Sequence, residues 1–137
     1  FKIFNMKGYR DVNKLHIWFG TEYYRAIRHY DKSDNIFFVL KGSRHFRISK
    51  PTINVFDMYP FNHASNRHTY PNYPLLEEFR EGREIPDDYV IHESTLYENE
   101  VLYLPCFWYH EVINNNITVA LSIWWDSNDA ERGDDIE

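Results

Sequence analysis

Short runs of β-branched and aromatic residues, most of them bounded by Gly, Pro, Asn or Asp, recur along this sequence. Side chains of these kinds pack well on a pleated surface, so the runs predict β-strands. A chain of 137 residues fits one domain. The runs predict a mainly β sandwich or barrel with strands at 15–19, 26–30, 35–40, 44–48, 55–58, 89–93, 101–104, 108–114 and 118–125.

Two turn signals separate pairs of these runs. Lys41-Gly42 follows the strand expected at 35–40, and the asparagine cluster at 114–116 follows the strand expected at 108–114. Glycine and asparagine accept the left-handed backbone of tight turns. The sequence therefore predicts two hairpins, each joining strands that are neighbours.

The stretch 59–88 differs from the rest because it is rich in proline and holds a charged, helix-like piece at 75–84. Loops of this length in a compact domain are more often functional or disordered than incidental. We predict a loop-helix insertion that either faces the substrate or is a solvated excursion. The expected organisation is a core at 1–125 that carries the insertion, followed by an acidic tail at 126–137.

Composition and charge exclude several classes of protein. The single cysteine, Cys106, excludes an internal disulfide framework and is expected to be a buried, inert thiol. A formal net charge of −6 argues against a broad phosphate-binding surface. No apolar run approaches the ~20 residues that span a bilayer. We therefore expect no membrane association and an intracellular location, in the cytoplasm or the nucleus.

The residues that carry chemistry begin with His29 and Asp31, near the end of an expected strand. Side chains alternate between the two faces of a strand, so these two point to the same face. His110 lies far along the chain, on an aromatic strand. Taken singly, they are more readily explained as a surface pair and a core histidine. Together they form the two-histidine, one-carboxylate set of non-haem Fe(II) oxygenases, which also accepts Mn, Ni or Zn.

A family resemblance rests on motifs that follow one another in order along the chain. They are Trp18-Phe19-Gly20, His29-Tyr30-Asp31, the stretch 35–42, the stretch 102–105, Trp108-Tyr109-His110 and the stretch 122–125. With them the chain resembles the JmjC/cupin-like Fe(II)- and 2-oxoglutarate-dependent dioxygenases, and especially their small hydroxylase branch, over about residues 15 to 125. The resemblance implies a double-stranded β-helix, the cupin or jelly-roll barrel, with a metal inside one mouth.

The resemblance also implies a role for each residue of the site. It makes 2-oxoglutarate the cosubstrate of Fe(II). Without the resemblance, residues such as Phe37 and Trp124 are more often plain core residues, and a serine on a final strand, such as Ser122, is often a hydrogen-bonded filler. The implied set is His29, Asp31 and His110 as Fe(II) ligands, Asn35 beside the cosubstrate, Phe37 and Trp124 lining the pocket, and Ser122 nearby.

Two positions depart from the family pattern. Arg44 stands where the branch usually has a lysine that pairs with the distal carboxylate of 2-oxoglutarate. Arg44 shares a strand face with Phe46 and Ile48, so it should point inward, onto either the cosubstrate or an acidic side chain of the fold. A guanidinium can bind a carboxylate through two parallel hydrogen bonds. Ala26 stands where Ser or Thr is common, which removes one hydroxyl contact to the cosubstrate.

The remaining histidines predict no site of their own. They are expected to be surface or hydrogen-bonded residues rather than accessory metal ligands. These histidines are His16, His45, His63, His68 and His92.

The first hypothesis is therefore a dioxygenase that hydroxylates a C–H bond and releases succinate and CO₂. By the resemblance, its acceptor is a protein or peptide side chain, with tRNA as the less favoured substrate. Hydroxylation and demethylation stay open, because both begin with the same attack on a C–H bond. A second hypothesis is a non-catalytic metal-binding cupin module that binds a partner. A third is a metal-dependent isomerase or hydrolase.

Overall fold

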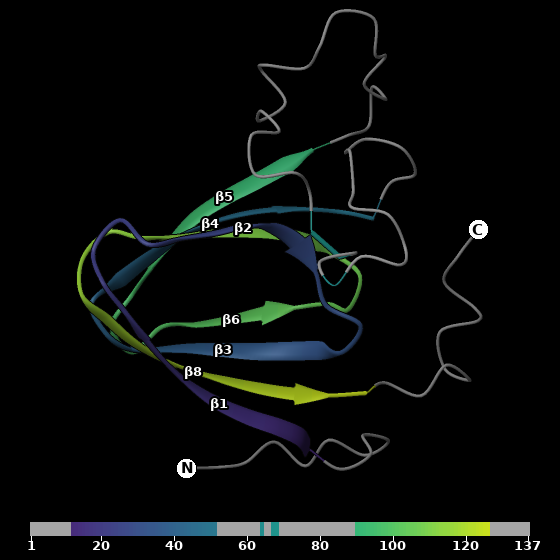
Figure 1. Cartoon of the computed structure of the whole chain (residues 1–137), viewed down its shortest axis with the longest axis horizontal. Coiled ribbons are helices and arrows are strands. Elements are labelled where there is room, and N and C mark those ends of the chain that lie inside the picture. Colours follow the sequence, from purple (N-terminus) through teal and green to yellow (C-terminus); the bar gives the residue numbers. More distant parts are fainter. Residues whose placement is uncertain (1–11, 52–63, 65–66, 69–89, 127–137) are drawn as a thin grey trace, which may run out of the picture.

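The computed structural model describes residues 12–51, 64, 67–68 and 90–126, which form two facing antiparallel sheets of four strands each (Figure 1). The first sheet has the order β1-β8-β3-β6 and the second has the order β2-β7-β4-β5. The strands are β1 (Val12–Gly20), β2 (Arg25–Tyr30), β3 (Asp34–Lys41), β4 (Ser43–Ser49), β5 (Ile91–Tyr97), β6 (Val101–Leu104), β7 (Tyr109–Asn114) and β8 (Thr118–Trp125).

The predicted mainly β fold is confirmed. β6 and β8 have the bounds expected from the sequence, and each other described strand overlaps a predicted one. The predicted strand at 55–58, the helical piece at 75–84 and most of the tail lie outside the described residues. The residues that are described include no helix of the length and hydrophobicity that a bilayer crossing needs.

The two predicted hairpins are wrong, although the turns are where the sequence placed them. Gly42 separates β3 from β4, but β3 pairs with β6 and β8 while β4 pairs with β5 and β7. The asparagine turn likewise joins β7 of the second sheet to β8 of the first. Turn residues report a reversal of the backbone and carry no information on whether the next strand stays in the same sheet. Both turns are corners between the sheets.

The core lies between the sheets and is formed by inward side chains of β3, β4, β5, β6 and β8, with Val112 of β7 packed against them. Phe46 of β4 and Ala120 of β8 are fully buried, and Phe37 of β3 packs edge-on against Phe46 with ring centroids 5.1 Å apart. The polar residues Arg44 and Ser122 alternate with these on the same inward faces and are also buried. The interior is therefore apolar at its centre and polar where the site lies.

We expect Gly42→Ala to lower the free energy of unfolding by about 1–3 kcal/mol. Gly42 has a φ of 80°, and a Cβ there would overlap the side-chain oxygen of Asn116 and the carbonyl oxygen of Ile117. Urea unfolding measures the loss. The matched control is Asn99→Gly, which puts glycine at a residue that already has a φ of 72° and should cost nothing. An unchanged urea midpoint in Gly42→Ala would contradict the claim that this corner requires glycine.

Candidate metal centre

The pairing of β2 with β7 brings the two predicted histidine ligands together. His29 and His110 are direct partners in the antiparallel register, and their ring centroids are 4.3 Å apart. Asp31 follows the end of β2, and its carbonyl oxygen accepts a 2.7 Å hydrogen bond from the backbone N–H of Phe107. One ligand atom from each of His29, Asp31 and His110 lies within 4.8 Å of the others. Ligand atoms that are each about 2 Å from a shared ion lie about 3–4 Å from one another. Small side-chain movements would therefore bring these three ligand atoms to the distances of a metal site.

Backbone carbonyl groups orient both imidazoles. His29 Nδ1 lies 2.7 Å from the carbonyl oxygen of Ile27, and His110 Nδ1 lies 3.1 Å from that of Trp108. A carbonyl oxygen only accepts hydrogen bonds, so each Nδ1 is the protonated nitrogen of a neutral ring. The Nε2 atoms then carry the lone pairs. This is the arrangement by which second partners fix the tautomer of a metal-binding histidine.

Burial keeps both rings neutral. Burial, and after it the neighbouring His110, together lower the pKa of His29 from 6.5 to about 4. Burial also lowers the pKa of His110, against the opposing pull of the Asp31 carboxylate. A neutral imidazole can coordinate a metal, whereas an imidazolium cannot. The site is thus ready to bind a metal at neutral pH.

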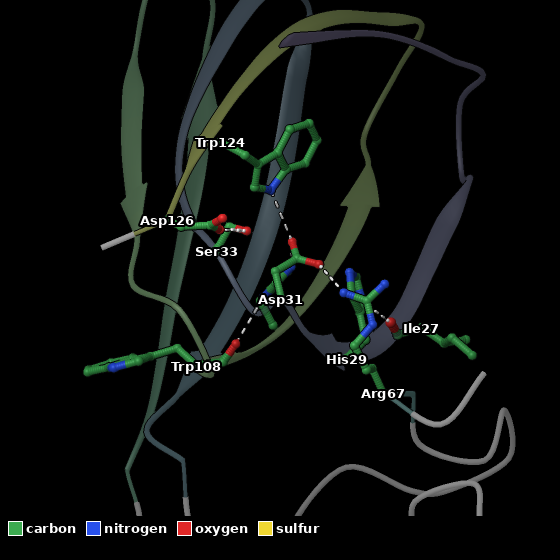
Figure 2. Close-up of polar contacts among 9 residues, drawn as sticks. Ile27, His29, Asp31, Ser33, Arg67, Trp108, Trp124 and Asp126 are labelled. Carbon is green, nitrogen blue, oxygen red and sulfur yellow. Dashed lines mark hydrogen bonds and ion pairs between the residues drawn. The ribbon is translucent and has the colours of Figure 1, made fainter. Parts of the chain in front are cut away.

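The Asp31 carboxylate is held from two sides (Figure 2). Its Oδ2 accepts a 3.4 Å hydrogen bond from the indole N–H of Trp124 and lies 3.8 Å from His110 Nε2. Its Oδ1 accepts a 3.3 Å hydrogen bond from Arg67 Nη1. The oxygen that faces His110 is therefore Oδ2.

A cavity between the sheets adjoins the histidines. Its lining includes both of them together with four other residues predicted from the sequence: Asn35, Phe37, Arg44 and Ser122. Trp124 was predicted to line the pocket, and the structure places its indole against Asp31. The predicted set is thus gathered at one end of the barrel.

Arg44 points inward, as strand alternation predicted. It is only 7% exposed, its Nε donates a 3.1 Å hydrogen bond to Thr118 Oγ1, and its guanidinium carbon lies 5.2 Å from the centroid of the Phe37 ring. Burial lowers the pKa of Arg44, yet a guanidinium stays charged in proteins. No carboxylate of the described residues is within ion-pair distance of it. Among the described residues, Arg44 therefore lacks the acidic partner that was one of its two expected contacts.

Other polar groups of the cavity are also available to a ligand. Within the described part of the chain, the buried side-chain oxygen of Asn35 has no hydrogen-bond partner. Ser122 accepts a 2.9 Å hydrogen bond from the indole N–H of Trp18, which leaves its own hydroxyl hydrogen to donate. Ala26 also lines the cavity and presents only a methyl group there. A buried cation beside unsatisfied amide and hydroxyl groups suits a small anionic molecule.

Arg67 and His68, which belong to the stretch 59–88, contact this site, and no sequence motif pointed to either of them. His68 was expected to be a surface or hydrogen-bonded residue. Its ring stacks on His29 with centroids 4.9 Å apart, and its backbone forms an isolated antiparallel bridge with His29. Arg67 contacts Asp31, as described above. Contacts with residues far away in the sequence bring them there.

The other histidines stay away from the three ligands. The ring of His16 packs edge-on against Trp124 at 4.8 Å, and His45 contacts Thr95 at 3.1 Å. His92 lies on β5 with its ring tilted toward Trp108, and His63 is outside the described residues. These positions give no second metal site among the described residues.

The family of the chain follows from its sequence as a whole. A family model described as a cupin-like domain matches residues 4–131. The chain belongs to the cupin-like domain family. This confirms the resemblance inferred from the ordered motifs, and the two-sheet barrel is the expected fold of the family.

A curated relative matches a similar span. The chain is 26% identical over 130 residues to the lysine-specific demethylase JMJ31 of Arabidopsis thaliana. The match covers 87% of this chain and 22% of that protein. The chain thus spans about a fifth of the length of that relative.

Solved structures agree in fold. YcfD of Escherichia coli superimposes with a TM-score of 0.58 at 16% identity, over 88% of this chain and 27% of YcfD. A second structure presents YcfD as a ribosomal oxygenase in complex with cobalt and 2-oxoglutarate, with a TM-score of 0.56 at 13% identity, over 88% of this chain and 25% of that one. At these identities the likeness concerns the fold.

We expect the metal-free protein to lose stability as the pH falls from about 6.5 to about 4. The folded chain keeps His29 neutral in this window, while the unfolded chain binds the proton, so acid favours the unfolded state. Urea unfolding in the presence of a chelator measures the effect. His29→Gln removes the titrating ring and should show a smaller loss. Equal losses in the two proteins would show that His29 is not responsible.

Proposed function

We propose that this chain is the core of an Fe(II)- and 2-oxoglutarate-dependent oxygenase. The observation that carries the proposal is the buried guanidinium of Arg44, which lies in the same cavity as His29 and His110 and has no acidic partner among the described residues. A buried cation is costly unless a counter-ion accompanies it. A dicarboxylate bound between Arg44 and a metal would be that counter-ion.

The donor set fits Fe(II). Two neutral imidazoles and one carboxylate leave adjacent coordination positions open, as in the facial triad of non-haem Fe(II) oxygenases. His29, Asp31 and His110 would hold the ion, with Ile27 and Trp108 orienting the rings through their carbonyl groups. Bound Fe(II) with 2-oxoglutarate supplies the chemistry that hydroxylates a C–H bond, with succinate and CO₂ as coproducts.

The residues of the cavity would bind and orient the cosubstrate. Arg44 would pair with its distal carboxylate, and Thr118 fixes the guanidinium through Nε. The side-chain amide of Asn35 and the hydroxyl of Ser122 offer further polar contacts, and Phe37 forms an apolar wall. Because the site lies between two packed sheets, it would hold the reacting groups apart from bulk water.

For the substrate, we propose a protein side chain. JMJ31 is named as a lysine-specific demethylase and YcfD as a ribosomal oxygenase. This chain covers only part of each of them. Hydroxylation is our preferred outcome, and demethylation would start from the same C–H attack.

We also propose an intracellular location for the protein.

We expect the wild-type chain to bind Fe(II) or Mn(II) and to release succinate when 2-oxoglutarate, ascorbate and O₂ are supplied with Fe(II). His110→Ala removes one of three ligands and should lower metal affinity by at least about tenfold and abolish succinate release. Calorimetry with Mn(II) and a succinate assay measure the two effects. A matched control is His45→Ala, on the adjacent strand β4 and facing Thr95. Wild-type metal affinity in His110→Ala would refute the ligand assignment.

We expect Arg44→Met to keep metal binding and to lose 2-oxoglutarate binding. In the wild type, 2-oxoglutarate should raise the melting temperature beyond the effect of Mn(II) alone, because it binds only the folded state. Arg44→Met should remove this second increment, and Arg44→Lys should restore part of it. Arg47→Met on the same strand is the control, since Arg47 is paired with Glu93 on the outer face.

The same melting experiment separates the oxygenase from a non-catalytic cupin module. That alternative is favoured by Ala26, whose methyl group lines the cavity where a hydroxyl would contact the cosubstrate. A module of this kind would respond to metal but show no increment with 2-oxoglutarate, in the wild type as in Arg44→Met.

A further inference from the structure

The two oxygens of Asp31 have different surroundings. Oδ2 lies 3.8 Å from His110 Nε2 and accepts from the indole of Trp124, so it is the oxygen that faces His110. Oδ1 accepts from Arg67 Nη1 at 3.3 Å (Figure 2). The carboxylate is therefore oriented with one oxygen toward the metal position and the other toward a cation.

Arg67 is fixed in place by its backbone. The N–H of Tyr30 donates a 3.2 Å hydrogen bond to the carbonyl oxygen of Arg67. The next residue, His68, bridges to His29 and stacks on its ring at an interplanar angle of 17°. These contacts attach Arg67 and His68 to Tyr30 and His29, at the end of β2 that leads to Asp31. The ion pair of Arg67 with Asp31 is thus built into the fold.

The positive charge of Arg67 lies next to a predicted metal ligand, which is unfavourable for binding a cation. A positive charge 3.3 Å from a ligand oxygen weakens the attraction of the site for a divalent ion. Arg67 therefore does not serve to tighten metal binding. What it can do is occupy Oδ1, since a charge-assisted hydrogen bond is stronger than a neutral one and costs more to break.

We propose that Arg67 is a positioning residue that restricts Asp31 to coordination through one oxygen. The inference rests on the proposed function. A carboxylate can bind an ion through one oxygen or through both. If Oδ1 also bound, it would take one of the three positions that the facial triad leaves open. A chelating 2-oxoglutarate needs two of these positions and O₂ needs the third, so Arg67 keeps the full set available.

The test uses the whole chain loaded with Mn(II), without 2-oxoglutarate, and measures the relaxation rate of water protons. This rate reports how many exchangeable waters the bound ion carries. Arg67→Gln should retain Mn(II) and lose about a third of the relaxation enhancement, because two open positions replace three. Its affinity for 2-oxoglutarate should fall by about tenfold or more. Arg67→Lys, which keeps a charged donor, should lie between Arg67→Gln and the wild type, and Arg47→Gln should match the wild type.

Each outcome decides between the alternatives. If wild-type protein binds Mn(II) and 2-oxoglutarate, and Arg67→Gln shows the same relaxation and the same 2-oxoglutarate affinity, the positioning role is overturned while the proposed function stands. Loss of Mn(II) binding in a folded Arg67→Gln would also overturn it, because Arg67 would then be needed to hold the metal. A wild-type chain that binds no Mn(II) would overturn the proposed function and this inference with it.

Discussion

The site depends on the antiparallel pairing of β2 with β7, whose register shifts between Ala26 and His29. That pairing sets His29 directly opposite His110 and carries the chain to Asp31 at the next inward position. A shift by one residue would turn one of the histidines to the other face of the sheet. The corners at Gly42 and at the asparagine turn fix the strands on either side, so the register is imposed by the whole barrel. Geometry that needs three donors within a few ångströms is thereby obtained from ordinary backbone hydrogen bonds.

The strands could be predicted because their signal is local. Alternation and turn residues marked the bounds of β6 and β8, and alternation also gave the inward direction of Arg44. The pairing could not be predicted in the same way. Every short connection among the described strands crosses from one sheet to the other, and a turn signal holds no record of that. Local signals predicted a sandwich or a barrel, and the resemblance to a known family indicated the double-stranded β-helix.

The site shows the same division. His29 and Asp31 are close in sequence, and their spacing alone indicated a shared face, while His110 joined them through the family motif. Arg67 and His68 lie in a stretch without periodicity, so nothing in the sequence connected them with β2. The contacts that hold them include a backbone hydrogen bond, a ring stack, an isolated β-bridge and the ion pair with Asp31. Site residues that are brought in by contacts distant in sequence, such as Arg67 and His68, cannot be predicted from sequence patterns.

The neighbours of β8 bear on how this barrel is made. β8 is hydrogen-bonded to β1 on one side and to β3 on the other, so the first and the last described strands lie side by side. During synthesis, β1 and β3 must wait without their shared partner until nearly all of the domain has left the ribosome. Contacts so distant in sequence make folding slow and leave strand edges open to other chains. The first sheet can thus be completed only late in synthesis, when β8 becomes available to pair with β1 and β3.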